Sequence, residues 1–68
     1  MNANLLKSEI IKKGLTQGDI AKAIGMSENS FSSKMRGKSD FGLDDANKIC
    51  DVLHIKDGKL KLAIFFDQ

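Results

Sequence analysis

The stretch TQGDIAKAIGMSENSFSSKMRG, residues 16–37, carries the clearest structural pattern in this sequence. Thr16 and Asp19 have the spacing of a capping box, in which the side chain of each residue accepts a hydrogen bond from the backbone of the other. This pair predicts a helix that covers residues 17–24. Gly25 follows the helix, and because glycine has no Cβ it can adopt the positive φ that a sharp reversal of the chain requires.

A second helix is predicted directly after this turn. Ser27 is a suitable N-cap, the helix covers residues 28–35, and Gly37 ends it. Phe31 and Met35 lie four residues apart, so they share one side of the helix and are expected to pack on the preceding helix. The other residues of this second helix are small, polar or charged. The stretch therefore predicts two short helices joined by a tight turn, the second with only a narrow apolar side.

The outer side of the second helix presents short hydrogen-bonding side chains and is flanked by cations. The hydrogen-bonding residues are Glu28, Asn29, Ser32 and Ser33, and the cations are Lys34, Arg36 and Lys38. Residues 1–38 contain seven basic and three acidic side chains, whereas residues 39–68 contain four basic and six acidic ones. Random scatter over a small surface is one interpretation of this asymmetry. The other is a polar helix held out to an anionic partner, for which double-stranded DNA is the obvious candidate.

The composition argues against several other kinds of function. A chain of 68 residues forms one domain, 1–68, and buries only about 60% of its unfolded surface, so its core is thin. One cysteine and one histidine cannot form an intramolecular disulfide or a Cys/His zinc site. The sequence has no Gly-rich phosphate loop and no metal-ligand spacing, so an enzyme is not expected. No metal, cofactor or small-molecule ligand is expected either.

The sequence also indicates where in the cell the protein is expected. No apolar run approaches the roughly 20 residues that span a bilayer, so no membrane partner is expected. The first ten residues lack a basic region followed by an apolar core, which is the pattern of a signal peptide. With a lone thiol as well, the expected compartment is cytoplasmic.

Apolar spacing predicts further helices and the inner faces of the domain. In residues 3–13 an apolar stripe recurs at helical spacing: Leu5, Leu6, Ile10 and Ile11. In the helix over residues 17–24 the inner face is Ile20, Ala23 and Ile24. In residues 43–53 one face carries Leu43, Ala46, Ile49, Cys50 and Leu53. The lone thiol, Cys50, is expected to be buried and structural, and His54 is expected to be an exposed residue at a helix end.

The tail, residues 56–68, has two interpretations. Its KLKL segment alternates like a strand, whereas Leu60 and Ile64 have helical spacing and Asp57 can cap a helix over residues 58–65. The helix is favoured, and in either form the tail is a candidate contact with a second subunit. The fold class predicted for the whole chain is all-α, a compact bundle of four to five helices.

Residues 16–55, with Leu15, resemble the helix-turn-helix domain of the phage Cro/repressor (XRE-like) family, and in particular its small single-domain phage and prophage regulators. The residues that carry the resemblance are Gln17, Ala21, Gly25, Phe31, Gly37 and the Leu-x-x-Ala-x-x-Ile-x-x-x-Leu run over 43–53. The resemblance implies a lambda-repressor-like DNA-binding domain whose helix-turn-helix motif, residues 16–37, is formed by the second and third helices. Its recognition helix, 28–35, would enter the major groove.

The resemblance also implies roles for individual residues. Base contacts fall to Glu28, Asn29, Ser32 and Ser33. Phosphate contacts fall to Gln17, Ser27, Lys34, Arg36 and Lys38. Glu28 departs from the family pattern, because many relatives carry glutamine there and a carboxylate can accept from cytosine N4 but cannot make the bidentate adenine contact of an amide. Two interpretations of Glu28 stay open: a changed base preference, or a carboxylate that only caps the helix. Gln17 could also be only an exposed first-turn residue.

The function expected from the residues and the resemblance together is sequence-specific DNA binding by a transcriptional regulator. One recognition helix reads only a few base pairs, so a homodimer is expected, formed in solution or only on DNA. The alternative function is a protein-interaction module, antirepressor-like or antitoxin-like, that reuses the fold. The two differ in salt dependence, because phosphate contacts weaken steeply as salt rises.

Overall fold

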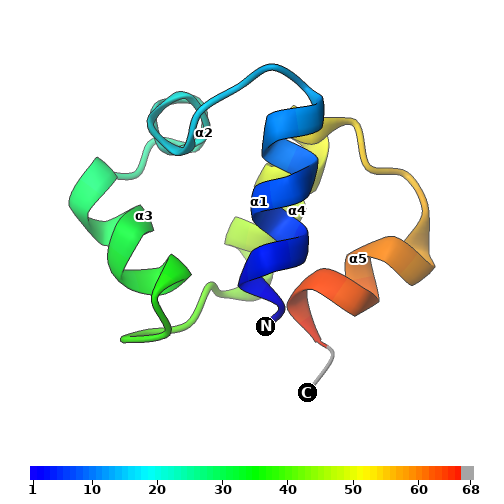
Figure 1. The fold of residues 1–68 in the computed structure, drawn as a ribbon. Coiled ribbons are helices and arrows are strands. Elements are labelled where there is room, and N and C mark those ends of the chain that lie inside the picture. The colour runs from blue at the N-terminus through cyan, green and yellow to red at the C-terminus, as the bar shows by residue number, and fades with distance from the viewer. Residues whose placement is uncertain (67–68) are drawn as a thin grey trace.

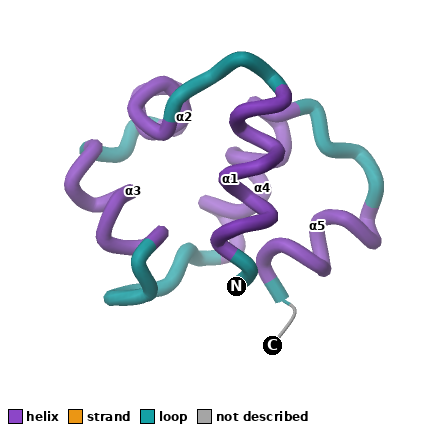
Figure 2. Tube along the Cα trace, viewed as in Figure 1, coloured by secondary structure: helices purple, strands orange, loops and turns teal. Residues whose placement is uncertain are grey.

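Five α-helices follow one another along residues 1–66, which are the residues that the structure, a computed structural model, describes (Figure 1). They are α1 (Ala3–Lys12), α2 (Gln17–Ile24), α3 (Glu28–Met35), α4 (Leu43–Leu53) and α5 (Gly58–Phe65). Within this part of the chain there is no strand, and loops join the helices throughout (Figure 2). The predicted all-α bundle is confirmed.

The helices begin where short polar side chains can satisfy free backbone N–H groups. The predicted capping box is present: Thr16 Oγ1 accepts from the Asp19 N–H at 3.0 Å, and Asp19 Oδ2 accepts from the Thr16 N–H at 2.9 Å. Ser27 Oγ accepts from the Ser30 N–H at 3.1 Å, which fixes the start of α3. The predicted bounds of α2 and α3 are therefore confirmed.

The tail folds as a helix, and the strand interpretation is wrong for the described residues. Asp57 Oδ1 accepts from the Lys59 N–H at 2.9 Å and caps α5. Ile64, on the inner side of α5, is fully buried. The tail therefore follows the helical spacing and not the alternation of KLKL, because a helix can bury one apolar side against α1 and α4. Residues 67–68 of the tail lie outside the described residues.

Every helix contributes to one core. Its members are Leu6, Ile10, Ile20, Ala21, Phe31, Met35, Ile49, Leu53 and Ile64. α2 packs against both α3 and α4, and α1 packs against α5. The backbone joins the two ends of the chain as well, since the Asn2 N–H donates to the Ile64 carbonyl at 2.6 Å. Lys61 on α5 donates to Asn47 Oδ1 on α4. The last helix is thus held on α1 and α4.

Three residues expected on inner faces lie at the surface. Ile11 is 74% exposed and Leu43 is 62% exposed, and Ala23 is exposed as well. Ala21, in contrast, is buried. Because α2 is covered on two sides by α3 and α4, its buried stripe shifts toward Ala21 and leaves Ala23 in solvent. Leu43 is the first residue of α4 and projects beyond the cover of its neighbours.

Cys50 is buried on α4, as predicted. Desolvation by burial raises the pKa of its thiol above the ordinary value of 9.0; nearby Lys61 opposes this rise, and Asp51 adds to it. His54, one residue past α4, is exposed and adopts a left-handed conformation with φ 56°. The predicted buried thiol and the predicted helix-end histidine are both confirmed.

The raised pKa of Cys50 predicts a pH dependence of stability. Burial favours the neutral thiol more in the folded chain than in the unfolded chain. The contribution of Cys50 to the free energy of unfolding is therefore fully present below pH 9.0, and it is lost as pH rises through the pKa of the folded chain. We expect the free energy of unfolding of the native protein to fall more steeply above pH 9.0 than that of Cys50→Ala. Urea unfolding of both proteins between pH 7 and pH 11 measures this. Parallel curves would contradict it.

Candidate nucleic-acid interface

The turn between α2 and α3 is set by one backbone conformation. Gly25 has φ 76° and ψ 27°, which lies in the left-handed region. Directly after it, the Met26 N–H donates back to the Ala21 carbonyl at 2.9 Å, so the chain reverses as soon as α2 ends. In Figure 1 α2 is seen end-on and α3 from its side, so the two helix axes cross. An added Cβ at Gly25 would meet no atom within 4 Å, so it is the positive φ that favours glycine there.

Two side chains of α3 are buried in the described part of the protein. Phe31 is fully buried and Met35 is 6% exposed. Phe41, in the loop after α3, meets the Phe31 ring edge-on with 5.2 Å between ring centroids. The same Phe41 ring packs on Phe65 of α5 at 6.2 Å. A chain of aromatic rings therefore joins α3 and its following loop to the C-terminal helix.

The four predicted base-contact residues lie on α3: Asn29 and Ser33 are opposite Phe31 and Met35, Ser32 is beside them, and Glu28 is on the side that faces α2. Glu28 and Asn29 are exposed, whereas Ser32 and Ser33 are half-buried. α3 is the helix at the left edge of the molecule in Figures 1 and 2, remote from α5. α3 thus lies at one side of the domain, and Asn29 is an exposed predicted base contact on it.

Arg36 is linked to this face by a side-chain hydrogen bond. Its Nη1 donates to Ser32 Oγ at 2.7 Å, one turn earlier along the chain. The structure therefore brings together one predicted phosphate contact and one predicted base contact. Because a guanidinium has five N–H donors, the remaining donors of Arg36 stay free for an anion while the hydroxyl of Ser32 restrains the guanidinium.

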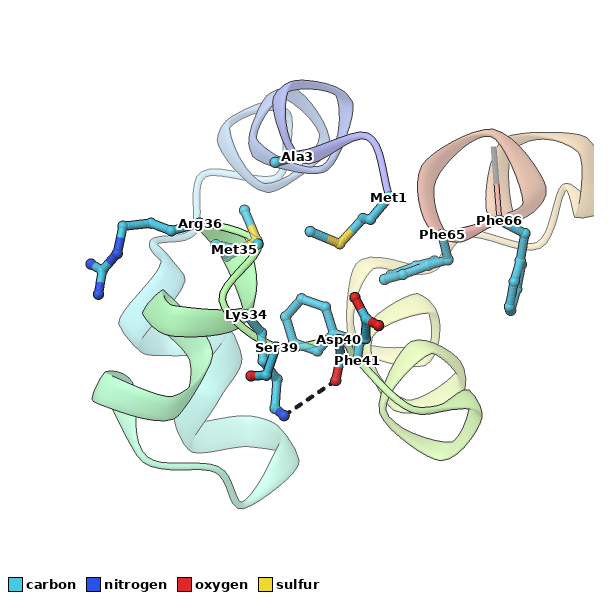
Figure 3. A pocket seen from close by; sticks show the side chains of 11 residues that line it. Met1, Ala3, Lys34, Met35, Arg36, Ser39, Asp40, Phe41, Phe65 and Phe66 are labelled. Atoms are coloured by element: carbon cyan, nitrogen blue, oxygen red, sulfur yellow. Dashed lines mark hydrogen bonds between the residues drawn. The ribbon is translucent and has the colours of Figure 1, made fainter. Parts of the chain in front are cut away.

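Lys34 and Lys38 occupy different surroundings. Lys34 is half-buried, and its Nζ donates to the backbone carbonyl of Asp40 at 3.2 Å (Figure 3). Lys38 is exposed just past Gly37, whose φ of 81° ends α3. The Lys38 N–H donates to the Ser33 carbonyl at 3.0 Å, so the backbone at Lys38 is fixed relative to α3. Lys34 therefore braces the loop, and Lys38 is the more accessible cation.

The remaining predicted phosphate contacts lie at two helix starts. Ser27 caps α3, with its hydroxyl occupied by the Ser30 N–H. Gln17 is the half-buried first residue of α2. Both positions are beside free N–H groups of a helix N-terminus, where the helix dipole favours an anion. Their predicted roles stay predictions.

Glu28 leans back on α2. An ideal Cβ built on Gly18 would collide with Glu28 Oε1 and would lie 3.3 Å from Glu28 Cδ. A small hollow forms around this carboxylate, lined by Thr16, Gly18, Asp19, Ala21, Lys22, Met26 and Glu28. The contact between Gly18 and Glu28 did not follow from the sequence analysis. Its only signal was a glycine inside a helix, where glycine is unfavourable.

A groove with both polar and apolar lining residues opens beside the end of α3, between the start of α1 and the end of α5 (Figure 3). It measures about 570 Å³. The apolar residues that line it are Met1, Ala3, Met35, Phe41, Phe65 and Phe66. Lys34, Arg36 and Asp40 bring charge to its edge. Met1 and Phe66 remain substantially exposed, at 42% and 50%, so the groove presents apolar surface next to the predicted phosphate contacts.

The described residues offer neither a metal site nor a membrane span. Within residues 1–66 no three His, Cys, Asp or Glu side chains come together as a group that could hold a metal ion. None of the helices in that range combines the length and the apolar character needed to cross a membrane.

Comparison with protein-family models matched residues 2–68 to the family described as "Protein of unknown function (DUF739)". Comparisons with curated proteins and with solved structures gave no match. The family match covers nearly the whole chain, including all five helices.

The aromatic chain predicts a specific loss of stability. Phe41→Ala removes the ring that joins Phe31 to Phe65. We expect it to lower the free energy of unfolding by about 2–3 kcal/mol, below the range for a fully buried phenylalanine because Phe41 is half-buried. Phe66→Ala is the matched control, since Phe66 is half exposed and should change stability by less than about 1 kcal/mol. Equal losses in the two variants, measured by urea unfolding, would contradict this assignment.

Proposed function

We propose a function for this chain, which belongs to the DUF739 family: it binds double-stranded DNA and regulates transcription, with α3 as the helix that enters the major groove. The observation that carries the proposal is the division of α3 into two sides. Phe31 and Met35 are the buried side chains of α3, while Asn29 lies exposed on the opposite side and Glu28 lies exposed at the start of the helix, toward α2. Arg36 and Lys38 follow at its C-terminal end, also exposed.

The chemistry of these side chains suits a DNA groove. The major groove is about 12 Å wide and admits one α-helix. Asparagine can bond an adenine edge with two hydrogen bonds, and serine hydroxyls donate or accept, so Asn29 and Ser33 are the proposed base contacts. The guanidinium of Arg36 and the ammonium of Lys38 are proposed to bind phosphates beside them, with Lys34, Gln17 and Ser27 as adjacent contacts.

A regulator with one short recognition helix is proposed to act in two copies. Eight residues of α3 can contact only a few base pairs, so two copies on a two-fold symmetric site, about 34 Å apart, would supply useful specificity. Leu62, on α5, and Phe66, directly after it, lie four residues apart and are 58% and 50% exposed. They are the proposed contact between copies. The proposed compartment is the cytoplasm, where such a regulator meets DNA.

Two variants separate base contacts from phosphate contacts. Asn29→Ala should weaken binding to the preferred site by about 1–3 kcal/mol and relax base preference at one position. Arg36→Ala should weaken binding to all sequences alike. Selection of bound sites from a random duplex library, followed by affinity measurements on the selected site and on an unrelated duplex, distinguishes the two effects. If the two variants lost affinity in the same pattern, the division of roles would be wrong.

Salt dependence tests the proposed function against its alternative. The affinity of the native protein for DNA should fall steeply as salt rises, and Arg36→Ala should lower the slope of log K against log salt by about 1. The groove beside α3 favours the second candidate function, a protein-interaction module, because exposed methionine and phenylalanine suit a protein partner. If no duplex bound even at low salt, the DNA-binding proposal would fail and the groove would be the surface to pursue.

A further inference from the structure

Gly18 stands at a position where the backbone does not require glycine. It is the second residue of α2, and it is absent from the glycines with positive φ. Glycine is among the poorest helix formers, so alanine would suit this position better by helix propensity. The space above Gly18 is nevertheless not free, because a Cβ there would collide with the carboxylate of Glu28.

The missing side chain gives Glu28 a place against α2. The carboxylate lies over the first turn of α2, at its positive end, where Lys22 also lines the hollow. Asp19 is the other anion in the hollow, and its Oδ2 is occupied by the Thr16 N–H of the capping box. Glu28 is thus turned back toward the preceding helix.

We infer that Gly18 is a positioning residue for Glu28 and thereby determines which base the interface prefers. This inference rests on the proposed function. A carboxylate placed over α2 is not offered to the floor of a groove, and it must leave this position before it can accept from a cytosine N4 amino group. Asn29 carries no such restraint, so it dominates the preference of the native protein. A side chain at position 18 would displace Glu28 from α2 and add a preference for cytosine.

The contact itself can be tested without DNA. In the free native protein, NMR should show cross-relaxation between the Glu28 Hγ and Gly18 Hα protons, because the Glu28 carboxylate occupies the space that a Gly18 side chain would fill. In Gly18→Ala the Glu28 carboxylate should move away, which would appear as a changed set of Glu28 side-chain couplings. The displaced group is the far end of a flexible side chain, so the variant should fold. Absence of the Glu28–Gly18 signal in the native protein would overturn the inference.

Base preference tests the consequence. In site selection from a random duplex library, Gly18→Ala should raise the preference for cytosine at one position by about tenfold over the native protein. The gain should vanish in the double variant Gly18→Ala, Glu28→Ala, because alanine leaves no acceptor for the cytosine N4 amino group. Gly58→Ala is the matched control: Gly58 also lies in the first turn of a helix, α5, but a Cβ there meets nothing within 4 Å. It should leave base preference unchanged.

The possible results separate this inference from the proposed function. If Gly18→Ala bound DNA with the preferences of the native protein, the positioning role of Gly18 would be overturned while DNA binding stood. A gain of cytosine preference that persisted in the double variant would also overturn it, because Glu28 would not be the residue responsible. If neither the native protein nor any variant bound a duplex at low salt, the proposed function would fail and the specificity role with it.

Discussion

The burial of Phe31 is the constraint on which the display of α3 depends. α3 is short, and apart from this ring and Met35 it has no buried side chain to hold it. The free energy that fixes the helix therefore comes from removing these two side chains from water. Phe41 extends the attachment, since its ring spans from Phe31 to Phe65. The orientation of the polar side of α3 is thus determined by contacts on its opposite side, and the C-terminal helix shares in holding it.

Much of the fold could be predicted from sequence because its boundaries depend on local chemistry. A capping box at Thr16 and Asp19, a cap at Ser27 and a glycine at the turn act within four residues of the chain, and each is present. The errors concern burial. Ala23 was expected inside but is exposed, since the sequence of a short helix cannot tell which neighbours cover it. The tail was ambiguous for a related reason, because its alternation and its helical spacing involve the same residues.

The surface of the candidate site could be predicted only in part. The spacing of Phe31 and Met35 predicts which side of α3 faces away from the core, and the exposure of Asn29 follows from it. The directions of the long side chains could not be predicted. Arg36 turns to Ser32, and Lys34 turns to the loop. Such side chains have many rotamers of similar energy, so the rotamer that each adopts depends on nearby hydrogen-bond acceptors and on the space available. These partners become neighbours only when the chain is folded.

The division of α3 also bears on how proteins with this fold can diverge. The side chains on its polar side contribute little to the core, and substitutions at exposed positions usually change stability by less than about 0.5 kcal/mol. Phe31 and Met35, in contrast, are constrained by packing. The residues of α3 that hold the fold are therefore different from the residues on its exposed side. Substitutions can therefore accumulate on the polar side of α3 while each successive variant still folds. This makes the helix a suitable place to engineer new recognition.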